Sequence, residues 1–201
     1  MTARLSRDQF LRRGAIGGGA LVLSSAAVAA LAGRASAATL PDTDLSYLRL
    51  LIGAELLAAD FESQALASGK LSRQQTTVFR KTAADEKVHY AGLAQLLTAA
   101  GQVPATADDI DFIYPKGTFA SSTSILKQAS EIEALVLGTY LGAIENVQTP
   151  ELRMPIGQIA ANEAQHVGAV AVLAGRNAIG RAFAASLSID TASAALDRFE
   201  S

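Results

Sequence analysis

Both histidines of this 201-residue chain stand three positions after a glutamate, in Glu86-Lys-Val-His89 and in Glu163-Ala-Gln-His166. Positions i and i+3 of an α-helix lie on one face, so a carboxylate and an imidazole with this spacing can approach the same metal ion. The sequence contains no other histidine and no cysteine. The two pairs therefore predict two helices that each supply one glutamate and one histidine to a metal site.

Two further glutamates interrupt apolar helical stripes elsewhere in the chain. Glu55 follows Leu51 and Ile52 at helical spacing, and Glu133 lies in a similar stripe. A carboxylate is rarely found in a core unless it is paired or binds a metal. Four buried carboxylates without a cation would repel one another, and some would take up protons. The predicted metal ligands are Glu55, Glu86, His89, Glu133, Glu163 and His166.

Several neighbouring side chains leave alternatives open. Glu131 points to roughly the opposite side of the helix from Glu133, so only one of the two can face the core, and the apolar stripe favours Glu133. The histidines could also be ordinary core residues that bond to backbone or carboxylate groups. Four side chains are candidates for hydrogen bonds to the ligands, or else for simple core packing or solvation at a bundle end: Tyr140, Tyr90, Glu62 and Glu145.

The segments that carry these residues have helical patterns with recognisable ends. We expect the first helix at 44–67, capped by Asp42, Thr43 or Asp44, and a helix kinked or restarted by Pro155 within 150–174. A short helix capped by Asp190 is expected at 191–199. The other two helices are expected at 72–100 and 122–146, with glycines ending the first and second helices.

The connections between these helices indicate their arrangement. The link after residue 67 is short, so the first two helices should form an antiparallel hairpin, whereas residues 102–122 are polar and long enough to cross a bundle from end to end. Glu86 follows Glu55 by 31 positions, and Glu163 follows Glu133 by 30, which favours two similar hairpins. We therefore predict an all-α four-helix bundle with one long crossover between its second and third helices and a short C-terminal helix.

Residues 1–37 have the pattern of an export signal. Arginines precede an apolar run rich in glycine and alanine, and Ala35-Ser-Ala37 follows as a cleavage signature. Ser6-Arg-Asp-Gln-Phe-Leu-Arg12 resembles a twin-arginine motif in which Asp8 replaces the second arginine. Twin-arginine export, general secretion and an uncleaved membrane anchor all stay open. We expect an exported protein, periplasmic, in the cell envelope or extracellular, with residues 38–201 as its folded domain.

Composition excludes several classes of function. The net charge is −2, and the predicted leader holds five of the basic residues but one acidic residue, so the folded domain is acidic and unsuited to nucleic acid. The absence of cysteine excludes a rubredoxin centre, an iron–sulfur cluster and thiol catalysis.

The chain resembles the ferritin-like superfamily, and within it the exported ferritin-2 group that includes desiccation-related proteins. The resemblance covers about residues 42–175 and implies a four-helix bundle with a dinuclear metal site, bridged by one glutamate of each Glu-x-x-His pair. Its most specific part is the doubled Glu-x-x-His. The segments that carry it are Leu48-Arg-Leu-Leu-Ile-Gly-Ala-Glu-Leu-Leu-Ala-Ala-Asp-Phe61, Asp85-Glu-Lys-Val-His89, Glu133 with Tyr140, and Asn162-Glu-Ala-Gln-His166.

The ligand types indicate the metal and the candidate functions. Carboxylates with one imidazole per ion suit two iron or two manganese ions, with zinc as an opportunistic occupant. Such a pair would act on dioxygen, peroxide or ferrous iron as a ferroxidase or a peroxide- or oxygen-reducing stress protein. The alternatives are a protein that binds metal without turnover, and a metal-free structural bundle in desiccation or stress tolerance. The sequence does not indicate an oligomeric state.

Overall fold

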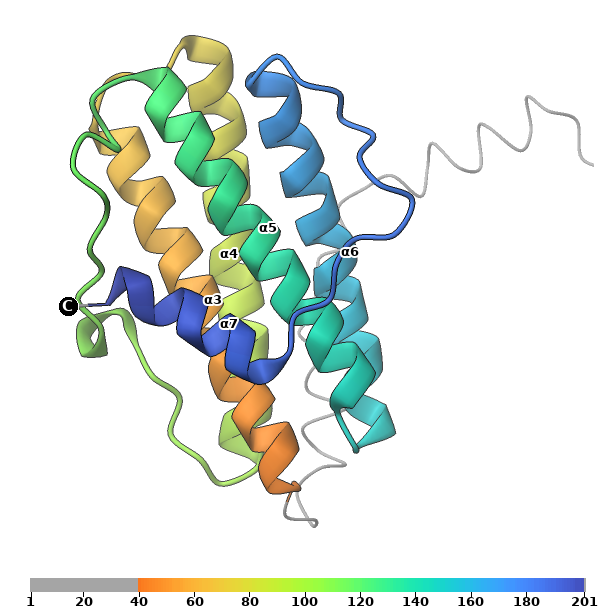
Figure 1. Ribbon diagram of the computed structural model, residues 1–201. Helices are drawn as coiled ribbons and strands as arrows, with labels where there is room; N and C mark the ends of the chain where they lie inside the picture. Colours follow the sequence, from red (N-terminus) through yellow and green to blue (C-terminus); the bar gives the residue numbers. More distant parts are fainter. Residues whose placement is uncertain (1–39, 201) are drawn as a thin grey trace, which may run out of the picture.

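The computed structural model describes residues 40–200, so the predicted leader at 1–37 lies outside the described residues. Four long helices form a bundle, and a short helix lies across it (Figure 1). The helices are α3 (Asp42–Ala67), α4 (Arg73–Ala99), α5 (Ser122–Asn146), α6 (Pro150–Leu173) and α7 (Ile189–Leu196). Two 3₁₀ turns, η1 (Ala107–Asp109) and η2 (Asp197–Phe199), complete the described elements. The predicted all-α bundle is confirmed.

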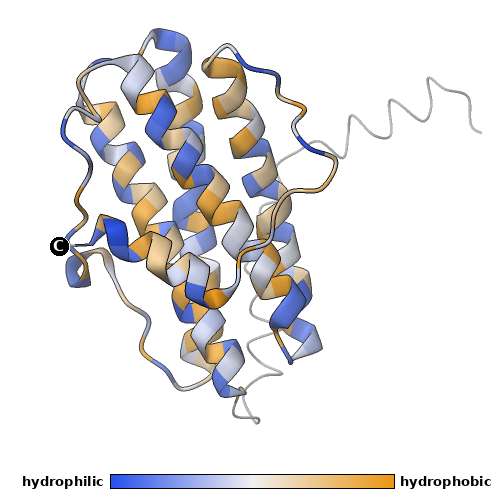
Figure 2. Cartoon of the chain, in the orientation of Figure 1, coloured by the Kyte–Doolittle hydropathy of each residue, from blue (hydrophilic) through white to orange (hydrophobic). Residues whose placement is uncertain are grey.

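The bundle consists of two antiparallel hairpins, α3–α4 and α5–α6, which meet mainly where α3 packs against α5. The segment between α4 and α5 is the predicted long crossover, and α7 packs on α3 and α5 (Figure 1). Apolar and polar residues alternate along each long helix (Figure 2), and the buried apolar faces form one continuous core. Within residues 40–200 no helix is both long enough and apolar enough to cross a membrane.

Local sequence signals set several helix ends. Ser72 caps α4, because its side chain accepts a hydrogen bond from the backbone of Gln75 while the Gln75 side chain accepts one from the backbone of Ser72. Ser121 caps α5 in the same way. Gly69 and Gly101 follow α3 and α4 with φ angles of +66° and +74°, the left-handed conformation that favours glycine.

The predicted cap of the first helix is wrong. Pro41 occupies the cap position without a side-chain hydrogen bond, and Asp42, Thr43 and Asp44 lie inside the first turn. The Asp44 carboxylate is buried and instead accepts hydrogen bonds from the backbone N–H groups of Gln148 (2.7 Å) and Thr149 (2.9 Å). It thereby joins the start of α3 to the start of α6, a tertiary role that helical periodicity does not reveal.

Two other expectations are met only in part. Helix α6 begins at Pro150 as predicted and is continuous through Pro155, so the helix does not restart there. Proline has no backbone N–H, so at this position the carbonyl of Glu151 loses its i→i−4 partner within the helix. Helix α7 starts two residues before the predicted 191–199 segment, and Ser188 caps it in place of Asp190. The Ser188 side chain accepts the N–H of Thr191, leaving Asp190 in the first turn.

A strap of residues 174–188 leads from α6 to α7, and its last part, at Ala185 and Leu187, lies directly against α5. The Leu187 N–H donates to the carbonyl of Gly138 at 2.9 Å. A Cβ added to Gly142 would lie 1.9 Å from the Leu187 carbonyl oxygen, and one on Gly138 would lie 2.8 Å from the Leu187 side chain. The two glycines, one turn apart, therefore allow the strap to approach the helix backbone.

We expect Gly142→Ala to destabilise the protein by about 1–3 kcal/mol, because the added methyl would force the strap away from α5. Gly157→Ala is the matched control, since no atom lies within 4 Å of a Cβ at that helical position. That change should stabilise the protein by up to about 1 kcal/mol through helix propensity. Urea unfolding of both variants measures the difference. Equal effects of the two changes would contradict the close approach of the strap.

Candidate metal centre

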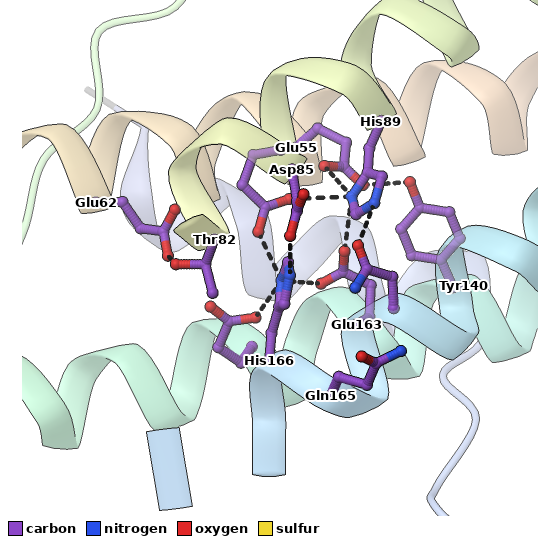
Figure 3. A network of polar contacts seen from close by, with 12 residues as sticks. Glu55, Glu62, Thr82, Asp85, His89, Tyr140, Glu163, Gln165 and His166 are labelled. Carbon is purple, nitrogen blue, oxygen red and sulfur yellow. Dashed lines mark hydrogen bonds and ion pairs between the residues drawn. The ribbon is translucent and has the colours of Figure 1, made fainter. Parts of the chain in front are cut away.

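The six predicted ligands converge in the interior of the bundle (Figure 3). They form two groups of four, and within each group the possible ligand atoms lie within 4.8 Å of one another. The His89 position is defined by Glu55, Glu86, His89 and Glu163, and the His166 position by Glu86, Glu133, Glu163 and His166. All six side chains are buried. Their convergence is now an observation, while their role as metal ligands stays a prediction.

Each position draws its side chains from both hairpins. Glu55 comes from α3 and Glu133 from α5, while α4 and α6 each supply a glutamate and a histidine. Glu86 and Glu163 belong to both positions, as bridging carboxylates would. Of the two rival glutamates on α5, Glu133 is buried and Glu131 is exposed. The core-facing direction predicted from the apolar stripe is therefore correct.

The Nδ1 atom of each imidazole faces three carboxylates. His89 Nδ1 lies 2.8 Å from Glu163 Oε1, 3.3 Å from Glu86 Oε2 and 3.5 Å from Glu55 Oε2. His166 Nδ1 lies 3.0 Å from Glu86 Oε1, 3.5 Å from Glu163 Oε2 and 3.8 Å from Glu133 Oε2. The two imidazoles are stacked, with ring centroids 5.9 Å apart.

Many of these atoms are close without being hydrogen-bonded. Among the described residues, buried atoms with no hydrogen-bond partner include both oxygens of Glu163, Oε1 of Glu86 and Nδ1 of His166. These atoms lie close together, but their geometry does not fit hydrogen bonds between them. They instead point towards common positions that an ion could occupy. A buried polar group without a partner is costly. A pair of cations would satisfy these atoms, and the residues present therefore fit a dinuclear metal site.

The outer nitrogen of each imidazole meets a residue from the opposite hairpin. His89 Nε2 lies 3.0 Å from Asn162 Oδ1, and His166 Nε2 lies 3.4 Å from Asp85 Oδ2. An acceptor at Nε2 holds the proton there and leaves Nδ1 free to face the cluster. Asp85 and Asn162 were not predicted as functional. Their signal in the sequence is that each immediately precedes a ligand glutamate, Glu86 or Glu163.

Of the four candidate neighbours, Tyr140 and Glu62 lie beside the cluster. The Tyr140 hydroxyl is buried and donates to Glu55 Oε1 (Figure 3). Burial first, and then the nearby Glu55, raise the pKa of this hydroxyl, so it remains a donor. Glu62 is buried and accepts the Thr82 hydroxyl, but it belongs to neither ligand group.

The other two candidates lie elsewhere. The Tyr90 hydroxyl donates to the backbone carbonyl of Ala105 at 2.9 Å. Tyr90 therefore attaches the crossover to α4 and does not orient a predicted metal ligand. Glu145 is exposed near the end of α5. Helical spacing put both residues near the ligand face, but it could not show which side chains reach the centre of the bundle.

Burial and the neighbouring charges shift the pKa values of the groups in the cluster. Burial, reinforced by the charge of Glu86, raises the pKa values of Glu55 and Glu133 well above 4.5. Burial also opposes ionisation of Glu86, but its contacts with both imidazoles outweigh this and lower its pKa to about 2. Burial disfavours the charged imidazoles, yet the surrounding carboxylates raise the pKa of His89, and they raise the pKa of His166 to about 11.

The fold and these contacts define a helical bundle with a buried carboxylate–histidine cluster suited to two metal ions. A family model described as a ferritin-like domain matches residues 43–176, and the chain belongs to this ferritin-like family. A similar fold is found in the crystal structure of hypothetical protein MJ0754 from Methanococcus jannaschii DSM 2661. That likeness has a TM-score of 0.59 and 16% identity, and it covers 79% of this chain and 94% of the other. No curated protein matches the sequence.

Proposed function

We propose that the protein is an exported dinuclear iron or manganese protein with a redox or metal-handling role. Its substrates would be ferrous iron, dioxygen or peroxide, as in a ferroxidase or an oxygen- or peroxide-reducing stress protein. The observation that carries the proposal is the pair of ligand groups that share Glu86 and Glu163 in a buried position. Oxygen-rich positions with one imidazole each suit iron and manganese.

The side chains have distinct roles in this proposal. Glu86 and Glu163 would bridge the two ions, Glu55 with His89 would complete one position, and Glu133 with His166 would complete the other. When bound, iron or manganese would supply redox chemistry towards dioxygen or peroxide.

The surrounding residues orient the ligands and exclude water. Tyr140 fixes Glu55 by donating its hydroxyl, and Asn162 and Asp85 fix the two imidazoles. The apolar core around the cluster limits the access of water, which strengthens electrostatic interactions within the site.

The export part of the proposal is supported by residues 1–37, whose basic start, apolar run and Ala35-Ser-Ala37 sequence are typical of a cleaved leader. A periplasmic, envelope or extracellular site of action follows from it. The resemblance to desiccation-related proteins supports a role in stress tolerance. N-terminal sequencing of the protein recovered from each cell fraction tests both the cleavage and the location.

We expect about two metal ions per chain after anaerobic loading with ferrous iron or Mn²⁺, because the ligands divide into two overlapping groups. Mass spectrometry of metal per folded chain measures this ratio. Glu86→Gln combined with Glu163→Gln removes both shared carboxylates and should greatly reduce the ratio, whereas Glu131→Gln, on the exposed side of α5, should not. If the parent protein bound no more metal per chain than the double variant, the metal-site assignment would be refuted.

Turnover is tested separately from binding. Iron-loaded protein with an excess of ferrous iron should consume dioxygen or peroxide faster than the Glu86→Gln, Glu163→Gln variant at the same iron concentration. Stoichiometric binding without such consumption would favour a protein that holds metal without catalysis.

A further inference from the structure

We infer that the two metal positions are inequivalent, and that the His166 position binds a divalent cation more tightly than the His89 position because of Asp85. The inference rests on the proposed function, since it concerns the same two positions. In this inference Asp85 and Asn162 do more than orient the two imidazoles: their difference in charge also makes the two positions differ in metal affinity. The chain is nearly symmetric between its hairpins, so the few differences around the cluster decide which position is filled first.

The main difference lies behind the imidazoles. Asp85 and Asn162 occupy equivalent places, each one residue before a shared glutamate and each against the Nε2 atom of the histidine from the other hairpin. Asp85 offers a carboxylate and Asn162 a neutral amide oxygen. An imidazole held by a carboxylate is a more basic and more electron-rich ligand. The His166 position therefore has one additional negative charge on the far side of its imidazole.

A second difference favours the same position. Glu55, at the His89 position, accepts the Tyr140 hydroxyl on Oε1, which draws part of its negative charge away from a bound cation. The Oε2 atoms of Glu55 and of Glu133, its counterpart at the His166 position, both lack a hydrogen-bond partner among residues 40–200, so the Tyr140 contact at Oε1 is the difference between the two carboxylates. The carboxylate at the His166 position is thus the freer of the two.

One contact acts in the opposite direction. Lys81 pairs with Asp85 and partly neutralises it. The Lys81 side chain is 65% exposed and the Asp85 side chain 20% exposed, so water screens this pair. Exposed ion pairs of this kind are weak. The Asp85 carboxylate therefore keeps most of its effect on His166, whose imidazole is buried.

Stepwise binding to the parent protein does not test the inference by itself. Glu86 and Glu163 are shared, so the first ion neutralises ligands that the second ion also needs. The second ion would bind more weakly even at a symmetric site. The test must therefore measure each position in the absence of the other.

The histidines allow this separation. His89→Ala leaves the His166 position with all its ligands, and His166→Ala leaves the His89 position with its own. With Mn²⁺ as the probe, we expect His89→Ala to bind one ion about 10–100-fold more tightly than His166→Ala. Adding Asp85→Asn should remove most of this advantage in the His89→Ala protein and change affinity by less than about threefold in the His166→Ala protein. The electron paramagnetic resonance signal of free Mn²⁺ gives both affinities, and circular dichroism verifies helix content.

A second measurement keeps all six ligands and so does not depend on the folding of the histidine variants. Substoichiometric Zn²⁺ should shift the ¹⁵N resonance of His166 Nδ1 before that of His89 Nδ1 in the parent. Exchanging the two outer residues, with Asp85→Asn and Asn162→Asp together, should reverse this order.

The outcomes distinguish the inference from the proposed function. Equal Mn²⁺ affinities in the two histidine variants, an equal effect of Asp85→Asn in both, or an unchanged Zn²⁺ order in the exchanged protein would overturn the inequivalence. In each case two ions bound to the parent would leave the proposed function standing. A parent that binds neither Mn²⁺ nor Zn²⁺ would overturn both.

Discussion

Replacing Glu55 and Glu133 with glutamine should make the metal-free protein more stable at pH 8, although both changes are made in its core. Burial raises the pKa of each carboxyl well above 4.5, so the folded protein binds protons at these two groups more strongly than the unfolded chain does. A carboxyl of this kind weakens the fold as pH rises from its unfolded pKa towards its folded pKa. The cost is about 1.4 kcal/mol per pH unit for each group.

The dependence on pH gives the sharpest measurement. The free energy of unfolding of the metal-free parent, from urea titrations between pH 6 and pH 9, should fall with rising pH. The free energy of unfolding of the Glu55→Gln, Glu133→Gln protein should fall less steeply, by up to about 1.4 kcal/mol per pH unit for each carboxyl removed. The raised pKa of His166, about 11, contributes stability that is complete below 6.5 and is lost as pH rises towards 11. This contribution acts in the same direction as that of the two carboxyls.

Two single changes serve as controls. Glu131→Gln on the exposed side of α5 should alter stability by no more than about 0.5 kcal/mol at any pH. Glu86→Gln should destabilise the metal-free protein, because contacts with both imidazoles lower the pKa of Glu86 to about 2 and its charge stabilises the fold above pH 4.5. Mn²⁺ should stabilise the parent and not the double variant. Identical pH slopes in parent and double variant would contradict a protonated carboxylate cluster.

Binding of two Mn²⁺ ions to the metal-free protein at pH 7 should release protons, up to about four of them. Glu55, Glu133, His89 and His166 all have raised pKa values, and each must lose its proton to become a ligand. The overall affinity for the pair should then increase by up to about four powers of ten per pH unit near neutrality. We therefore expect pH to have a very large effect on the metal affinity of this protein.

Calorimetry in two buffers that differ in ionisation enthalpy counts the released protons. His166→Ala, which removes one proton-holding ligand and one complete position, should release fewer. If the parent released no protons while binding two ions, the ions would lie outside the cluster.

The helices were predictable because their signals are local. All four long helices begin and end within two residues of the predicted bounds, since apolar periodicity, serine caps and terminating glycines act over a few positions. The errors occur where distant segments meet. Asp44 looks like a cap in the sequence, yet it bonds to the backbone of Gln148 and Thr149, more than a hundred positions away.

The candidate site was predictable for a related reason. A glutamate or histidine in an apolar stripe must face the core, so the doubled Glu-x-x-His spacing and apolar periodicity together identified all six converging side chains. What it could not provide was the identity of their neighbours. Asp85 and Asn162 reach histidines on another helix, and Tyr90 turns towards the crossover rather than the cluster. These contacts depend on how the hairpins dock.

If the cluster binds metal as proposed, the sharing of ligands between the hairpins would place metal binding late in folding. Each hairpin joins helices that are adjacent in sequence, so each can form rapidly through local contacts. Neither hairpin alone holds a full set of ligands, because both groups combine side chains from α4 with side chains from α6. A metal ion can therefore select the docked bundle, but it cannot nucleate either half. Metal capture would be one of the last steps of maturation, and loss of metal would be an early sign that the two hairpins have begun to separate.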